Sequence, residues 1–134
     1  MVDDDPEDRM IFYEAIKELK PEIQCEMMPG GEEALQYLNS LLRLPDFLFV
    51  DINMARMDGY EFCAELGKIE KYAAIPIVIY AGVITPEIIK EFDALGARYF
   101  FVKPVTIDEI KEIILAVVNA EKKIHSEGYY RNVA

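Results

Sequence analysis

The chain has 134 residues, a length that favours a single domain. Its 14 basic and 25 acidic side chains give a net charge of −11, which argues against direct binding to nucleic acid or to an anionic membrane surface. No apolar run approaches the roughly 20 residues that span a bilayer, and no secretory signal precedes the first helix. With 52% hydrophobic residues the chain can bury a core, and its 2 cysteines form no zinc-binding spacing, so we expect a cytoplasmic protein.

Helical and extended patterns alternate along the chain, as expected for βαβ units. The first helix begins at Pro6 behind Asp5 as N-cap, and Pro21 ends it. Extended segments are predicted over residues 23–28, 47–50, 77–80 and 99–102, and further helices over about 31–42, 60–69, 86–95 and 106–123. Apolar strands between helices indicate a doubly wound α/β fold with a parallel sheet over residues 1–123, followed by a tail over 124–134.

The strand before the first helix has only Met1 and Val2, whereas a strand usually has about five residues. Either this strand is very short, or upstream residues of it are missing from the sequence. We favour missing residues, since the strand is central in the fold expected below.

Charged side chains follow three of the predicted strands at the point where each strand ends. Asp3, Asp4 and Asp5 follow the first strand, Asp51 follows the 47–50 strand, and Lys103 follows the 99–102 strand. Because ligands of open α/β sheets bind beyond the carboxyl ends of the strands, we expect these groups to converge. Clustered carboxylates suit Mg²⁺, and a lysine beside them suits a phosphoryl group. The pattern predicts phosphoryl transfer onto a carboxylate.

In these motifs the chain resembles the receiver domain of two-component response regulators, over about residues 1–123. The matching stretches are Val2-Asp3-Asp4-Asp5-Pro6, Pro45-Asp46, Val50-Asp51-Ile52-Asn53-Met54, Met57-Asp58-Gly59, Gly96-Ala97, Phe100 and Lys103-Pro104. The spacings from Asp51 to Ala81 and from Ala81 to Lys103 also agree with that family. The likeness is greatest to small stand-alone bacterial receivers. It implies a flavodoxin-like (βα)5 fold with a five-stranded parallel sheet in the order 2-1-3-4-5, the first strand being truncated here.

The resemblance implies a signalling module that is switched by phosphorylation and catalyses only its own phosphotransfer and dephosphorylation. Asp51 would accept the phosphoryl group from a partner histidine kinase or histidine phosphotransfer protein, and Lys103 would pair with Asp51 at rest and with the phosphoryl group after transfer. The Mg²⁺ ligands would be Asp3 (through water), Asp4, Asp51 and the backbone carbonyl of Asn53.

The resemblance also implies a cis peptide bond before Pro104, and two positions depart from the family. Ala81 stands where the family usually has serine or threonine, and Phe100 stands where many members have tyrosine. We therefore expect Asp51 to accept phosphate while its coupling to the output surface is weaker or different.

Two other functions stay open: a degenerate receiver that binds partners without phosphate, and a phosphohydrolase of the haloacid-dehalogenase type. The second needs an acid two residues after the nucleophile, where this chain has Asn53. The apolar residues of the 106–123 helix cover more than one face. We expect that helix, with the 99–102 strand and the 86–95 helix, to contact a second copy of the chain or a target protein.

Overall fold

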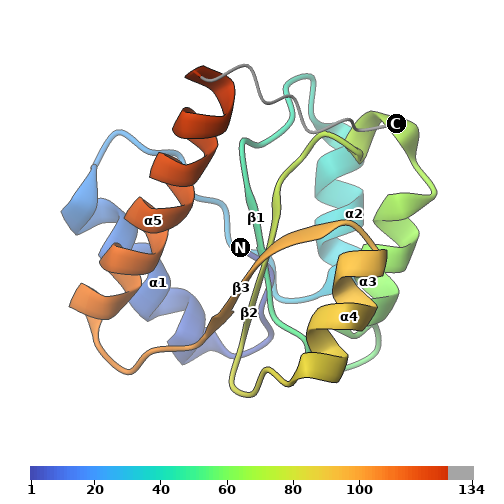
Figure 1. Ribbon diagram of the computed structural model, residues 1–134, viewed down its shortest axis with the longest axis horizontal. Coiled ribbons are helices and arrows are strands. Elements are labelled where there is room, and N and C mark those ends of the chain that lie inside the picture. Colours follow the sequence, from blue (N-terminus) through green and yellow to red (C-terminus); the bar gives the residue numbers. More distant parts are fainter. Residues whose placement is uncertain (127–134) are drawn as a thin grey trace.

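The computed structural model describes residues 1–126. Its parallel strands β1 (Leu48–Val50), β2 (Ile77–Ala81) and β3 (Ala97–Val102) form a sheet in the order β1-β2-β3. One face of the sheet is covered by α1 (Pro6–Leu19) and α5 (Ile107–Ser126). The other face is covered by α2 (Gly31–Ser40), α3 (Gly59–Gly67) and α4 (Pro86–Ala94), with a short 3₁₀ helix, η1 (Glu70–Tyr72), after α3 (Figure 1). The predicted doubly wound α/β fold is confirmed.

The helices α1, α3 and α4 begin at residues whose side chains cap them, whereas α2 begins behind Gly30 without a side-chain cap. Asp5 Oδ1 accepts a hydrogen bond from the Glu7 N–H at 2.9 Å, which satisfies a free donor at the start of α1. Asp58 and Thr85 cap α3 and α4 in the same way. After α4 the chain turns at Gly96, whose φ of 95° favours glycine.

Two hydrophobic cores lie on the two faces of the sheet. Every residue of β1 and β2 is buried, which explains their continuous apolar sequence. On the α1 and α5 side, Phe12 packs against Phe49 and Tyr80 with ring centroids 4.9 and 5.7 Å apart. Tyr80 therefore points into this core, as the alternation along β2 predicts.

The prediction of a regular strand over residues 23–28 is wrong. Of this segment only Met28 forms a bridge, and its partner is Val2, which also bridges Val50 on its other side. Val2 thus lies where the order 2-1-3-4-5 puts the first strand, although regular strands form only from β1 onward. The physical reason is that a strand needs a partner along its length, and only Met1, Val2 and Asp3 offer one.

The helix ends differ from the predictions by a few residues. The helix α2 stops at Ser40, so Leu42 is not helical and is fully exposed. The last helix continues past residue 123 to Ser126, while the rest of the predicted tail, 127–134, lies outside the described residues. Among the described residues, no helix combines the length and the apolar character that crossing a membrane requires.

Candidate functional site: an acidic pocket at the carboxyl ends of the strands

Three chain segments bring the predicted charged residues to one edge of the sheet. Asp3 directly follows the bridged Val2, and Asp51 directly follows β1. Lys103 follows β3, and its N–H donates to the Ala81 carbonyl at 2.8 Å, which extends the pairing of β2 and β3 by one residue. The predicted convergence of Asp3, Asp51 and Lys103 is what the parallel topology produces.

The Lys103 ammonium lies between three carboxylates. Its Nζ is 2.7 Å from Asp3 Oδ2, 2.8 Å from Asp8 Oδ2 and 3.3 Å from Asp51 Oδ2. Lys103 is only 16% exposed, so these ion pairs are largely shielded from water. Asp8 was not predicted as a site residue, since an acid in the first turn of a helix is already explained by the helix dipole.

Asp3, Asp4 and Asp51 form a cluster of three carboxylates that suits a divalent cation. This cluster, together with Lys103, is called the acidic pocket. One oxygen from each lies within 4.8 Å of the others. Backbone N–H groups orient them: Asp5 donates to Asp3 Oδ1, Ala55 to Asp4 Oδ2 and Ile52 to Asp51 Oδ1, at 2.9 to 3.1 Å. Asp3 Oδ2 is buried, and its charge partner is the Lys103 ammonium at 2.7 Å. The three carboxylates offer oxygen donors only, which fits Mg²⁺.

The pocket shifts the acidity of its members. Burial, followed by the charge of Asp3, raises the pKa of Asp51 to about 6, against the opposing effect of Lys103. Desolvation disfavours the charged Lys103, but its bonds to Asp3 and Asp8 outweigh this and raise its pKa. Lys103 is therefore a permanent cation at neutral pH, while Asp51 loses its proton only near pH 6.

Gly59 is a second site residue that sequence reasoning missed. A Cβ at this position would lie 2.3 Å from the Asp51 carbonyl oxygen and 2.8 Å from the Ile52 Cα. The Gly59 N–H also donates to the Ile52 carbonyl at 2.7 Å. In the sequence, Gly59 stands only within a matching motif and has no assigned role, whereas in the structure it lets the start of α3 pack directly on the backbone of Asp51.

The remaining predicted positions surround this pocket. Ala81 is buried at the end of β2, Phe100 is half-buried in β3 on the α2, α3 and α4 side, and Asn53 is exposed two residues beyond Asp51. The predicted cis bond before Pro104 is wrong: the described residues contain no cis peptide bond. The trans form is the one that even X–Pro bonds prefer, by about 0.5–1 kcal/mol.

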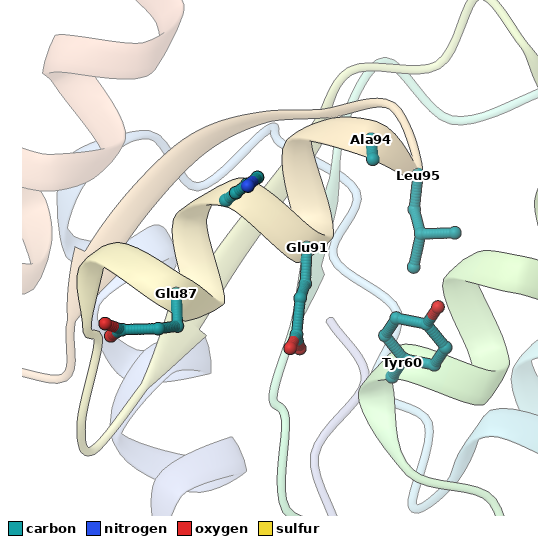
Figure 2. A pocket seen from close by; sticks show the side chains of 6 residues that line it. Tyr60, Glu87, Glu91, Ala94 and Leu95 are labelled. Carbon is teal, nitrogen blue, oxygen red and sulfur yellow. The ribbon is translucent and has the colours of Figure 1, made fainter.

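A pocket of about 450 Å³ lies between α3 and α4. Figure 2 shows Tyr60 of α3 facing Leu95, with Glu87 and Glu91 along α4. The Tyr60 ring also packs edge-on against Phe92, 5.9 Å between centroids. None of the residues lining this pocket belongs to the acidic pocket.

Comparison with known proteins gives one family. The model of the response regulator receiver domain matches residues 1–115. Chemotaxis protein CheY4 of Vibrio cholerae has a similar solved structure, with a TM-score of 0.76 and 27% identity, covering 87% of this chain and 93% of that one.

Two curated relatives differ greatly in length. The sensor histidine kinase CheAY of Helicobacter pylori is 27% identical over 120 residues, which are 90% of this chain but 15% of the kinase. The two-component response regulator ORR8 of Oryza sativa subsp. indica is 29% identical over 114 residues, which are 85% of this chain and 92% of that protein. Sequences of this kind thus occur both within long kinases and as short proteins.

Proposed function

Because the chain belongs to the response regulator receiver domain family, we propose that it is a signalling module whose Asp51 accepts a phosphoryl group from a histidine kinase or a histidine phosphotransfer protein. The observation that carries this proposal is the position of the Asp51 carboxylate. It lies at the end of β1, 3.3 Å from the Lys103 ammonium and beside the carboxylates of Asp3 and Asp4. An acceptor oxygen, a fixed cation and a set of hard oxygen ligands thereby meet in one pocket.

In the proposed transfer, an Asp51 carboxylate oxygen forms a bond to phosphorus as the P–N bond of a phosphohistidine breaks. The leaving imidazole nitrogen keeps the bonding electron pair and takes up a proton. The bond between Ile52 N–H and Asp51 Oδ1 holds the carboxylate, so that Oδ2 faces Lys103. Lys103 is already charged and needs no proton transfer to balance the incoming phosphoryl oxygens.

Receiver domains bind Mg²⁺ at an acidic pocket, and this chain has such a pocket. We propose that Asp3, Asp4 and Asp51, with the backbone carbonyl of Asn53, hold the ion. When bound, Mg²⁺ supplies positive charge that offsets the repulsion between the carboxylates and the phosphoryl oxygens. The protein would catalyse only its own phosphorylation and dephosphorylation, with no turnover of an outside substrate.

We further propose that the phosphorylated state is transmitted through α4, β3 and α5. Supporting this, apolar side chains are exposed on or just after these elements: Ile89 is 42%, Val102 is 54%, Val105 is 89% and Leu115 is 43% exposed. A target protein or a second copy of the chain would cover them. At the pocket, Ala81 offers no hydroxyl to a phosphoryl group, which would weaken the link between phosphorylation and this surface.

The proposal includes a cytoplasmic location. Cys25 and Cys63 are both free, which suits a reducing compartment.

The test is the intact mass of the protein after incubation with acetyl phosphate, with and without Mg²⁺. We expect one phosphoryl adduct that requires Mg²⁺ and is absent from Asp51→Asn. Asp46→Asn is the matched control, because it makes the same chemical change at an exposed residue that lies two positions before the start of β1. It should form the adduct as the unaltered protein does.

An adduct that persists in Asp51→Asn would contradict the assignment of Asp51. No adduct on the folded protein, either with acetyl phosphate or with a phosphorylated histidine phosphotransfer protein, would favour the degenerate receiver that binds partners without phosphate. Continuous release of phosphate without a stable adduct would favour a phosphohydrolase.

A further inference from the structure

Asp8 contacts the acidic pocket but has no part in the transfer described above. It lies in the first turn of α1, and its Oδ2 accepts a hydrogen bond from Lys103 Nζ at 2.8 Å. The start of α1 is fixed, since Asp5 Oδ1 accepts hydrogen bonds from the N–H groups of Glu7 and Asp8 at 2.9 and 3.4 Å. The way in which α1 begins therefore holds the carboxylate of Asp8 against Lys103.

Lys103 shares its charge among three carboxylates, and it lies closest to the two that do not accept the phosphoryl group in the proposed reaction. Its Nζ is 2.7 Å from Asp3 Oδ2 and 2.8 Å from Asp8 Oδ2, but 3.3 Å from Asp51 Oδ2. A lysine ammonium has three N–H donors. In the resting protein the shortest contacts of these donors are thus with Asp3 and Asp8.

Phosphorylation changes the charge that Lys103 has to balance. The phosphoryl group adds negative charge at Asp51, and its oxygens need N–H donors that Asp3 and Asp8 hold in the resting protein. Asp8 Oδ2 and Asp51 Oδ2 lie against the same nitrogen, so the charge of Asp8 also repels the incoming phosphoryl group. Both effects of Asp8 oppose the transfer.

Of the two close contacts of Lys103, the one with Asp8 is given up at the lower cost. The side chain of Asp8 is 35% exposed, so water can solvate its carboxylate once the ammonium has turned away, whereas the side chain of Asp3 is fully buried. Asp8 is also not needed to keep Lys103 in place. The contact with Asp3 and the hydrogen bond from the Lys103 N–H to the Ala81 carbonyl, at 2.8 Å, both remain without it.

We propose that Asp8 is a positioning residue that holds the Lys103 ammonium toward α1 in the resting protein and competes with the phosphoryl group for it, so that Asp8 slows the phosphorylation of Asp51. This inference rests on the proposed function. Lys103 then has two arrangements: one bonded to Asp3 and Asp8, which is the arrangement in the structure, and one bonded to Asp3 and a phosphoryl oxygen. The charge of Asp8 determines how strongly the first arrangement is favoured.

The test is the rate at which the full chain forms the phosphoryl adduct with acetyl phosphate and Mg²⁺, followed by intact mass. The unaltered protein is compared with Asp8→Asn, Asp8→Glu and Glu7→Gln. Asp8→Asn removes the charge that competes for Lys103, and we expect its adduct to form about threefold to tenfold faster. Asp8→Glu keeps the charge and should restore the slow rate of the unaltered protein.

Glu7→Gln is the matched control. Glu7 is exposed, directly precedes Asp8 in the same turn of α1, and is not among the three carboxylates of the described residues that Lys103 contacts. The substitution removes one charge from the same helix end and should leave the rate unchanged. A purely structural role of Asp8 would instead slow the reaction in Asp8→Asn, because a loosened Lys103 stabilises the phosphoryl group less well.

An unchanged or lower rate in Asp8→Asn would overturn the proposal. An equal increase in Glu7→Gln would also overturn it, since the effect would then be one of net charge, and so would a fast rate in Asp8→Glu, since the charge of residue 8 would then not restrain Lys103. If none of the proteins forms an adduct, the proposed function itself fails. An adduct that forms at the same rate in all of them overturns only the role of Asp8.

Discussion

The ionised carboxylate of Asp51 lowers the free energy of unfolding at neutral pH. Burial and the charge of Asp3 raise its pKa from 3.8 to about 6. The folded protein therefore holds this proton more tightly than the unfolded chain does. The stability that Asp51 contributes is full below about pH 4 and is lost as the pH rises through 6. Above that pH the folded state carries a buried charge that the unfolded chain solvates better.

Asp51→Asn should accordingly stabilise the metal-free protein at pH 7.5. The rise in the pKa of Asp51 from 3.8 to about 6 already includes the opposing effect of Lys103. One pKa unit corresponds to about 1.4 kcal/mol, so we expect a gain of about 2–3 kcal/mol. At pH 5 the advantage should shrink by roughly 1 kcal/mol, because Asp51 is then protonated in the folded protein. Urea unfolding in EDTA at both pH values measures this. A variant that is less stable than the unaltered protein at pH 7.5 would show that Lys103 outweighs burial.

Gly59 ties the backbone of Asp51 to the start of α3, and no other residue fits there. In Gly59→Ala the new methyl would lie 2.3 Å from the Asp51 carbonyl oxygen, so α3 or the loop before it must shift. We expect a loss of about 2–3 kcal/mol in unfolding free energy and slower phosphorylation, since Asp51 moves with its backbone. Chemical denaturation and the acetyl phosphate reaction measure the two effects.

Gly67→Ala is the control for that change. Gly67 ends the same helix, and a methyl there would meet nothing within 4 Å. It should leave phosphorylation unchanged and be neutral or stabilising by up to about 1 kcal/mol. Similar losses in both variants would mean that an added methyl group is unfavourable anywhere in α3, and that contact with Asp51 does not explain the effect of Gly59→Ala.

At the scale of the elements, sequence periodicity is sufficient to predict a helix or strand whose apolar residues are all buried against the rest of the domain. The helices show apolar residues at helical spacing and recognisable caps, and β1 and β2 are apolar because both faces are covered. The segment 23–28 has the alternation of a strand but lacks the partner that would make it one. Whether this segment forms a regular strand depends on pairing with residues 1–3, which the sequence of 23–28 alone does not predict.

The candidate site divides in the same way. Asp3, Asp51 and Lys103 could be predicted because each directly follows a strand position, and parallel topology brings such ends together. Asp8 could not be predicted, because its contact with Lys103 depends on the orientation of α1 relative to the sheet. Gly59 could not either, since its role follows from a close approach between backbones.

The ion pair between Arg98 of β3 and Glu121 of α5 joins two elements at the opposite edge from the acidic pocket. Both side chains are nearly buried, at 11% and 7% exposure, and Tyr99 donates a further hydrogen bond to Glu121. Arg98→Met should lower the unfolding free energy by about 3 kcal/mol, because it removes the ion pair that Arg98 makes with this buried carboxylate. Thermal and urea unfolding measure the loss.

The double variant Arg98→Met with Glu121→Leu separates charge from packing. Replacing both charged groups by apolar ones should recover most of the stability that Arg98→Met loses. If the double variant is instead as unstable as the sum of the single changes, the pair acts through specific geometry rather than through the cost of burying a carboxylate that has lost Arg98.

For the whole molecule, an excess of acidic side chains characterises both the overall composition and the acidic pocket. The net charge of −11 gives a general repulsion that any salt screens, whereas Asp3, Asp4 and Asp51 are held together by the fold. A divalent cation that binds this group prefers the folded chain, because the unfolded chain does not assemble the three carboxylates. Binding must therefore raise the stability of the entire domain.

We expect MgCl₂ at ten times its dissociation constant to stabilise the protein by about 1.4 kcal/mol, or roughly 5 °C in melting temperature. NaCl of equal ionic strength should give a much smaller shift, because screening alone does not bridge the carboxylates. In Asp4→Asn the Mg²⁺-dependent part should largely disappear, since an exposed ligand is lost without disturbing the buried Asp3 and Asp51. Asp46→Asn lowers the net negative charge by the same amount and should retain the full shift. A Mg²⁺ effect that both variants lose equally would be one of total charge, and the acidic pocket would then not be the metal site.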